Sequence, residues 1–169
     1  MSIVLGKFNI KAIFFDFDGV FTDNRVWTLS NGDELIVCSK KDSLGLDNFR
    51  LFLREKNITL EMAIISRESN SVVLSRSNKL KLDCHLGVIN KFSFINKHYR
   101  IEKEEYIFFG NDMNDVEAMK NAAISLAPQD ADISALEVAS FIGQRDGGDG
   151  FIREGLEYVT NLLKGIRTK

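Results

Sequence analysis

The sequence predicts an α/β fold in which helices cover both faces of a parallel central sheet. Short, wholly apolar runs such as residues 13–15 and 106–109 alternate with longer amphipathic stretches. Runs of this length predict strands that are buried on both faces, and their alternation with helical patterns is typical of a parallel sheet. Ligands bind such sheets beyond the carboxyl ends of the strands. Polar residues that follow the apolar runs are therefore the candidate site.

The first strand, residues 13–15 with Ala12 before it, leads into a pair of aspartates and then into a small hairpin. Asp16 and Asp18 lie two apart on extended backbone, so their side chains point to the same side. The Asn-Gly sequence at positions 31–32 separates segments 25–29 and 34–38, which is a strong hairpin signal. We expect a flap too small to form a cap domain.

Helices and strands alternate through the rest of the chain. Asp42 and Ser43 open an amphipathic stretch that continues to residue 53, which predicts a helix that they cap. The elements expected after it are strand 60–66, helix 70–82, strand or turn 84–87, helix 90–99, strand 106–109, helix 116–122, strand 124–127, helix 131–138, strand 141–142 and helix 151–163.

The composition is that of a globular protein and excludes several classes of function. The chain has 169 residues, 44% of them hydrophobic and 27% charged, so we expect a single domain over residues 1–169. A formal net charge of −2 gives no field that would attract nucleic acid or an anionic membrane. Cys38 and Cys84 lack a metal-ligand spacing, and no apolar run is long enough to span a membrane. Residues 1–11 lack the apolar core of a signal peptide, so a cytoplasmic location is the expectation.

The residues at the strand ends together predict phosphoryl transfer. Asp16 and Asp18 end one strand, Ser66 ends another, residues 111–115 follow a third, and Lys91 begins a helix near the same edge. Carboxylate and amide oxygens are the ligands that Mg²⁺ prefers. One carboxylate can attack phosphorus and a second can transfer protons, while a hydroxyl and an ammonium group bind the phosphoryl oxygens.

Four of these segments resemble the four motifs of the haloacid dehalogenase superfamily phosphatases, in the family's order. They are residues 16–22, Ser66, Lys91 and residues 110–115. The short hairpin and the glycine-rich stretch 145–154 are similar to the capless branch. That branch includes 3-deoxy-D-manno-octulosonate 8-phosphate phosphatases, the 9-phosphate phosphatases of nine-carbon ulosonic acids, and the C-terminal domain of acylneuraminate cytidylyltransferases. The resemblance implies a Rossmann-like three-layer α/β/α sandwich. It also implies a homotetramer whose hairpins associate centrally and whose neighbouring subunits complete each active site.

The resemblance also implies a role for each motif residue. Asp16 would be the nucleophile and Asp18 the general acid and base. Mg²⁺ would be held by the Asp16 carboxylate, the Asp18 backbone carbonyl and the motif at Asn111, and Ser66 and Lys91 would bind the phosphoryl group.

Two positions depart from the family pattern. Most relatives carry Asp where Asn111 stands, which leaves open either weaker metal binding or compensation by Asp112 or Asp115. Arg67 stands where Gly usually follows the motif Ser or Thr. Since both aspartates of the first motif are intact, we expect an active phosphatase.

The expected substrate is a 3-deoxy-2-ulosonic acid phosphate. Glu68, Arg76 and Lys79 resemble the trio that recognises the sugar acid in nonulosonate 9-phosphate phosphatases, which favours a nine-carbon substrate over an octulosonate 8-phosphate. Arg76 and Lys79 are three apart and share a helix face that could meet a carboxylate. The alternative is that the trio is only a solvated helix face.

The first motif and the tail supply the remaining candidate substrate-binding residues. The resemblance places Thr22, Arg145, Gly147 and Gly148 among them. The alternative for the glycines is a flexible turn before the last helix, since they do not have the GxGxxG spacing.

Two other functions remain open from the sequence. A catalytically weak oligomerisation module related to the cytidylyltransferase domains would account for Asn111. A receiver domain of the response-regulator type also pairs acidic residues with a lysine, but the Asp-x-Asp spacing and the position of Lys91 argue against it.

Overall fold

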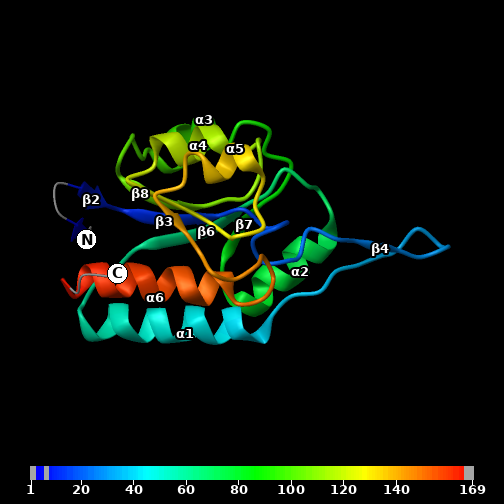
Figure 1. Cartoon of the computed structure of the whole chain (residues 1–169), viewed down its shortest axis with the longest axis horizontal. Coiled ribbons are helices and arrows are strands. Elements are labelled where there is room, and N and C mark those ends of the chain that lie inside the picture. The colour runs from blue at the N-terminus through cyan, green and yellow to red at the C-terminus, as the bar shows by residue number, and fades with distance from the viewer. Residues whose placement is uncertain (1–2, 6–7, 166–169) are drawn as a thin grey trace.

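The computed structural model describes residues 3–5 and 8–165, and its centre is a six-stranded sheet. The strand order is β10-β9-β8-β3-β6-β7, and every neighbouring pair is parallel. Helices cover both faces (Figure 1), so the predicted three-layer α/β/α fold is confirmed. The strands are β3 (Ala12–Phe15), β6 (Glu61–Ile65), β7 (Asp83–His85), β8 (Tyr106–Phe109), β9 (Ile124–Ala127) and β10 (Phe141–Ile142).

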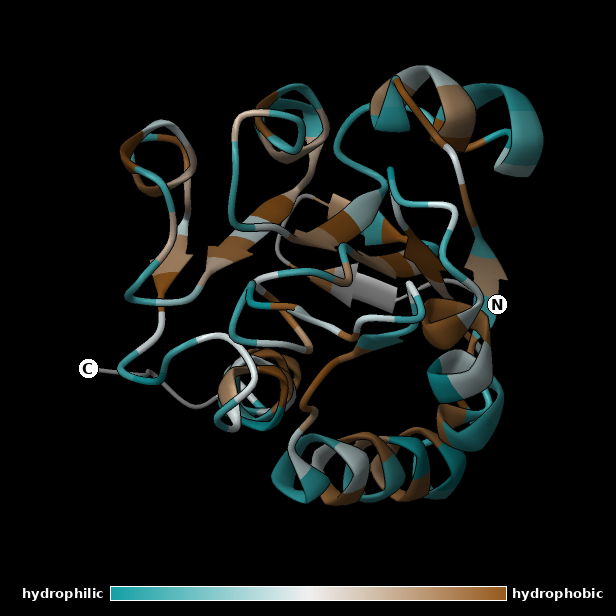
Figure 2. Ribbon diagram, turned by 90° about the vertical axis from the view of Figure 1, so that its right-hand side faces the viewer, coloured by the Kyte–Doolittle hydropathy of each residue, from teal (hydrophilic) through white to brown (hydrophobic). Residues whose placement is uncertain are grey.

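The helices form two groups that sandwich the sheet, as Figure 2 shows. One group consists of α1 (Lys40–Glu55), α2 (Ser71–Leu80) and α6 (Phe151–Leu163). The other consists of α3 (Lys91–Phe94), its π-helical continuation η1 (Ile95–Tyr99), α4 (Val116–Asn121) and α5 (Ile133–Leu136).

The central strand β3 is apolar at every position because both of its faces are covered. Ile13 and Phe15 are buried in the hydrophobic cluster that includes residues of α1, α2 and α6. Ala12 and Phe14 are buried in the cluster that includes residues of α4 and α5. Because successive side chains of a strand point to opposite faces, a strand covered on both sides must be hydrophobic at every position.

The helix start predicted at Asp42 is wrong. Ser39 caps α1, because its side chain accepts a hydrogen bond from the backbone N–H of Lys41 (3.1 Å). Asp42 lies inside the first turn and is fully buried, and its Oδ1 accepts from the backbone N–H of Arg153 in α6 (3.2 Å). Gly150, the N-cap of α6, has no side chain to bind those free N–H groups, so Asp42 supplies an acceptor from the neighbouring helix.

Two other expected helices begin later than predicted, because a cap residue precedes each of them. Asn70 is the N-cap of α2, and Asp132 is the N-cap of α5; each side chain accepts a backbone hydrogen bond two residues further on. Pairing in the flap is also shorter than the predicted strands, being confined to β4 (Trp27–Thr28) and β5 (Glu34–Leu35). The flap projects away from the body of the molecule (Figure 1).

The N-terminal residues add an element that the sequence patterns did not predict. β1 (Ile3–Leu5) and β2 (Phe8–Ile10) form an antiparallel pair ahead of β3. Residues 1–2, 6–7 and 166–169 lie outside the described part of the chain. The expectations for residues 1–11 and for a single domain over residues 1–169 therefore concern some residues that the structure does not describe. Among the described helices, none has the length and apolar character that a bilayer crossing requires.

Candidate active site

The three central strands bring the predicted residues to one edge of the sheet. β3 lies between β8 and β6, and all three run in the same direction. Asp16 directly follows β3, Ser66 directly follows β6, and Asn111 follows Gly110 at the end of β8. All three line one cleft of about 330 Å³ together with Asp18. This is the position at which parallel α/β sheets bind ligands.

Lys91 joins two of the carboxylates beneath the cleft. Its Nζ lies 2.6 Å from Oδ1 of Asp16 and 2.6 Å from Oδ1 of Asp115. The side chains of Lys91 and Asp115 are fully buried, and that of Asp16 is 7% exposed. Two buried carboxyl groups therefore share one ammonium group, so ionisation of both would leave an uncompensated negative charge in a place that water hardly reaches.

Burial and the excess of carboxyl groups over ammonium groups shift the pKa values of this cluster. Burial and then the Asp115 carboxylate raise the pKa of Asp16 to about 8, although Lys91 acts in the opposite direction. Burial acts to lower the pKa of Lys91, but the carboxylates of Asp16 and Asp115 outweigh it and raise that pKa. Lys91 therefore stays charged, and the cluster favours the arrival of a further positive charge.

Asp18 is only partly buried and faces the same cleft. Burial and then the Glu68 carboxylate raise its pKa, against the influence of Lys91. A carboxyl group with a raised pKa holds its proton at higher pH, so it is better suited to donate that proton to a leaving oxygen.

Ser66 is oriented by its neighbours in the loop after β6. Its Oγ accepts a hydrogen bond from the backbone N–H of Glu68 (3.0 Å), and the residue is 1% exposed. Because the hydroxyl oxygen already accepts from the backbone, its proton is available to donate to an oxygen of a bound ligand.

Asn111 provides an oxygen that fits a hard cation. Within the described residues, its Oδ1 is buried and has no hydrogen-bond partner. A buried acceptor without a partner costs about 1–3 kcal/mol, and a cation would offset that cost. Gly19 makes room for this side chain, since a Cβ built there would lie 1.9 Å from Nδ2 of Asn111.

The other two acidic residues of this loop differ in their availability. Oδ2 of Asp115 accepts from the backbone N–H groups of Asn111 (2.9 Å) and Asp112 (3.3 Å), while its Oδ1 contacts Lys91. Both oxygens of Asp115 are therefore engaged in holding the loop. Asp112 lines the cleft, and its Oδ1 accepts from the backbone N–H of Met113 (2.6 Å).

A cation here would have mixed ligands. Across residues 3–5 and 8–165, no group of three or more His, Cys, Asp and Glu side chains is placed to hold a metal. The ligands expected from the resemblance are the Asp16 carboxylate, the Asp18 backbone carbonyl and the Asn111 amide oxygen, and an all-oxygen set of this kind would suit Mg²⁺ with several retained waters.

The structure separates the trio expected to recognise the sugar acid. Glu68 lines the cleft, whereas Arg76 and Lys79 do not. Arg76 donates from Nη2 to the Ser39 carbonyl oxygen (3.1 Å) and to Ser43 Oγ (2.9 Å), at the start of α1. Lys79 is exposed on α2. Within one chain, therefore, neither cation reaches the cleft that contains Asp16.

Thr22, Gly147 and Gly148 support the loop of the first motif from behind. Oγ1 of Thr22 is buried and accepts from the backbone N–H groups of Gly19 and Asn24 (3.2 Å each). A Cβ at Gly147 would lie 2.0 Å from the carbonyl oxygen of Gly19, and one at Gly148 would lie 2.6 Å from the carbonyl carbon of Thr22. None of the three lines the cleft.

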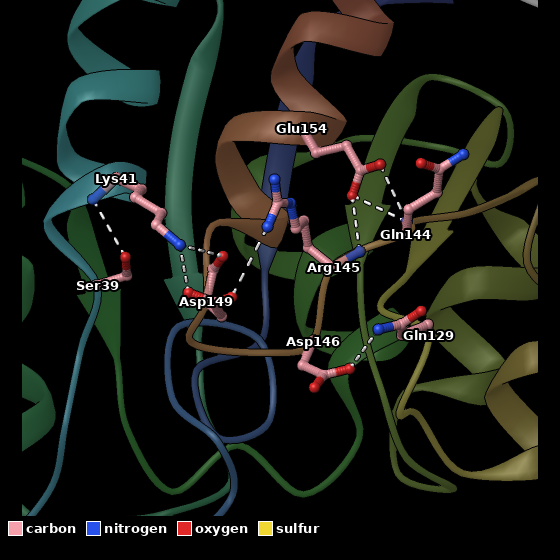
Figure 3. Close-up of polar contacts among 8 residues, drawn as sticks. All are labelled: Ser39, Lys41, Gln129, Gln144, Arg145, Asp146, Asp149 and Glu154. Carbon is pink, nitrogen blue, oxygen red and sulfur yellow. Dashed lines mark hydrogen bonds and ion pairs between the residues drawn. The ribbon is translucent and has the colours of Figure 1, made fainter.

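Arg145 belongs to the tail loop before α6, which Figure 3 shows in detail. Its backbone N–H donates to Glu154 (3.1 Å), and its guanidinium lies 4.0 Å from Asp149, which also contacts Lys41. The Arg145 side chain is 58% exposed and lies outside the cleft that contains Asp16.

Two cationic residues of the cleft, Arg25 and Arg67, are absent from the predicted site. Arg67 directly follows Ser66, so adjacency was a signal for it, although the sequence identified it only as a departure from the family. Arg25 lies at the base of the flap, and its place in the cleft depends on the path of the chain after Asp18. No local pattern indicates that path.

Comparisons with known proteins agree with this geometry. The family described as haloacid dehalogenase-like hydrolase matches residues 6–154. The 3-deoxy-D-manno-octulosonate 8-phosphate phosphatase KdsC of Escherichia coli is 30% identical over 151 residues, which are 86% of this chain and 77% of that protein. N-acylneuraminate cytidylyltransferase B of Danio rerio is 24% identical over 86% of this chain, but the chain spans only 35% of that protein's length.

Similar solved structures lead to the same family. A 3-deoxy-D-manno-octulosonate 8-phosphate phosphatase of Moraxella catarrhalis, in complex with a magnesium ion, a phosphate ion and a KDO molecule, has a TM-score of 0.79 and 26% identity, over 93% of this chain and 87% of that one. A HAD family hydrolase from Streptomyces avermitilis has a TM-score of 0.78 and 31% identity, over 93% and 94% of the two chains. The resemblance predicted from the motifs is confirmed: the chain belongs to the haloacid dehalogenase-like hydrolase family, and its relatives include phosphatases of that family.

Proposed function

We propose that this phosphatase hydrolyses the phosphomonoester of a 3-deoxy-2-ulosonic acid with the help of Mg²⁺, through a phosphoryl group carried on Asp16. The observation that carries the proposal is the position of Asp16. It is held by Lys91 at the carboxyl end of the central strand, in the same cleft as Asp18, Ser66 and Asn111. Phosphoryl transfer needs mainly positioning and charge neutralisation, which such a constellation supplies.

The proposed metal ligands are the Asp16 carboxylate, the Asp18 backbone carbonyl and Oδ1 of Asn111, with Asp112 beside them. The unpartnered buried oxygen of Asn111 and the presence of two carboxyl groups for the one ammonium group of Lys91 support a cation at this place. Bound Mg²⁺ would neutralise charge on the phosphoryl oxygens and on the attacking carboxylate.

In the proposed mechanism, Asp16 attacks phosphorus and Asp18 donates a proton to the oxygen of the departing alcohol. Lys91 fixes Oδ1 of Asp16 and balances negative charge near the reacting atoms, while the hydroxyl of Ser66 donates to a phosphoryl oxygen. Asp18, now a carboxylate, then removes a proton from the water that attacks phosphorus and releases Asp16.

The proposed substrate is a nine-carbon, sialic-acid-like 9-phosphate, with octulosonate 8-phosphate as the next choice. Glu68 in the cleft supports the nine-carbon choice, and the similarity to octulosonate phosphatases supports the wider class. Both substrates combine a phosphate, several hydroxyl groups and a carboxylate.

We also propose that the protein forms a homotetramer through the flap. Several large apolar side chains of the flap are exposed, among them Trp27 (68%), Val37 (63%) and Leu35 (54%). Exposed apolar groups concentrated on a projecting hairpin are typical of an interaction surface, and a second copy of the chain carries a matching surface by symmetry.

Phosphate release from both ulosonate phosphates tests the proposed function. We expect turnover by the wild-type protein, loss of turnover in Asp16→Asn, and loss on addition of a chelator that excess Mg²⁺ restores. Asp47→Asn is the matched control, because Asp47 is exposed on α1 with only a 3.4 Å contact to Arg50. Normal turnover by Asp16→Asn would rule out the proposed nucleophile.

A second candidate function is a catalytically weak oligomerisation module. The neutral Asn111 and the similarity to N-acylneuraminate cytidylyltransferase B favour it. A stable oligomer that releases no phosphate from either ulosonate phosphate, even at high protein concentration, would support this alternative.

A further inference from the structure

The cleft contains two guanidinium groups that no described residue engages. Arg25 and Arg67 both line it, and neither side chain makes a hydrogen bond or ion pair within the described residues. Arg50 and Arg76 show the contrast: Arg50 donates to two backbone carbonyl oxygens, and Arg76 donates to Ser39 and Ser43. The two cleft arginines are therefore free to bind a ligand.

None of the acidic residues that line the cleft forms an ion pair with these arginines within the described part of the chain. Glu34 and Glu68 also line the cleft, but Glu34 accepts a hydrogen bond from Nδ2 of Asn70. The same Asn70 caps α2 through its Oδ1. This contact links the flap to the start of α2.

The phosphoryl group does not need these arginines, because other residues supply its contacts. Lys91, which is buried, and Ser66 lie at the sheet edge with Asp16, whereas Arg25 and Arg67 are exposed. A cleft of about 330 Å³ is in the size range of small-molecule sites, so it can hold more than a phosphate ion. The exposed part of the cleft, which contains Arg25 and Arg67, therefore suits a second anionic group on the substrate that carries the phosphate.

We infer that Arg25 and Arg67 bind the carboxylate of the substrate, at the end remote from phosphorus. Guanidinium groups match the planar, two-oxygen geometry of a carboxylate better than ammonium groups do. The Glu68 carboxylate and the Asn24 amide of the same cleft can bind the hydroxyl groups between the two anions. This assignment rests on the proposed function, and it gives to Arg25 and Arg67 the role that the sequence suggested for Arg76 and Lys79.

Steady-state kinetics on a matched pair of substrates tests the assignment. The pair is an ulosonate phosphate and its C1 carboxamide, which differ in the charge of one group. Charged hydrogen bonds contribute about 1.5–3 kcal/mol, so Arg25→Ala and Arg67→Ala should each raise KM for the carboxylate substrate roughly 10- to 150-fold. Their KM for the carboxamide should change much less, and Arg67→Lys should lie between Arg67→Ala and the wild type. Arg54→Ala, which removes an exposed arginine from the last turn of α1, is the matched control.

The outcomes separate the assignment from the proposed function. An unchanged KM for the carboxylate substrate in both alanine variants overturns the assignment and leaves the proposed function standing. Equal loss on the carboxylate and the carboxamide also overturns it, because the arginines would then act on the phosphate or on the fold. Wild-type protein that hydrolyses p-nitrophenyl phosphate but neither ulosonate phosphate overturns the proposed substrate class and the assignment with it.

Discussion

Replacement of Asp42 by Asn should remove a pH-dependent cost from the stability of this fold. Asp42 is fully buried between the first turn of α1 and the start of α6, and its Oδ2 has no hydrogen-bond partner within the described residues. Burial raises the pKa of Asp42 to about 6, against backbone hydrogen bonds from Arg153 and Ile152 and the charge of Arg76. The charged form is therefore disfavoured in the folded state.

The sign and size of the effect follow from linkage. Because the folded-state pKa is about 6 and the ordinary pKa of an aspartate is 3.8, the folded protein binds more protons than the unfolded chain between these pH values. The free energy of unfolding must then fall as pH rises through this window. The whole shift corresponds to about 3 kcal/mol at neutral pH, of which about 1 kcal/mol appears between pH 5 and pH 7.

Urea denaturation of the wild type and Asp42→Asn at pH 5, 6 and 7 measures this effect. The difference in free energy of unfolding, variant minus wild type, should grow by about 1 kcal/mol from pH 5 to pH 7. Other titrating groups are common to both proteins and cancel in the difference. Asp47→Asn, on the exposed side of the same helix, is the matched control. A difference for Asp42→Asn that stays constant from pH 5 to pH 7 would refute the argument from burial.

Three further predictions concern the site and the flap. Gly147→Ala should destabilise the protein by about 1–3 kcal/mol and lower turnover, because the new Cβ would lie 2.0 Å from the Gly19 carbonyl oxygen. Denaturation measures the stability and phosphate release measures the turnover. Wild-type values for both would contradict the supporting role of the tail loop. Asn111→Asp should lower the Mg²⁺ concentration for half-maximal activity roughly tenfold, since it adds a charged ligand oxygen; an unchanged Mg²⁺ titration would mean that Asn111 is no ligand. Trp27→Glu should dissociate the proposed tetramer of 19.1 kDa chains, which light scattering detects, and an intact tetramer would place the interface elsewhere.

The sequence predicted the central sheet and the site at its edge because both depend on local patterns. β3 and β8 are apolar and buried at every position, and the predicted site residues follow close behind β3, β6 and β8. Asp16, Asp18, Ser66 and Asn111 share the cleft for that reason. The role of each residue, and the single domain over residues 1–169, stay predictions.

Other features depend on tertiary contacts that spacing does not reveal. Asp42 is of a residue type that commonly caps the helix it begins. Its Oδ1 instead accepts from the backbone N–H of Arg153, in a helix more than a hundred positions away. Arg76 and Lys79 share a helix spacing, but the guanidinium of Arg76 is occupied at the start of α1. Arg25 reaches the cleft only because of the path of the flap.

Chemical trapping of the phosphorylated residue tests the central claim most directly. The protein is mixed with an ulosonate phosphate and Mg²⁺, quenched in acid within one turnover, and treated with borohydride, which reduces an aspartyl phosphate to homoserine. Peptide mass spectrometry should then find homoserine at position 16, and none in Asp16→Asn. Homoserine at another aspartate, or rapid phosphate release with no modified aspartate at any quench time, would contradict the account.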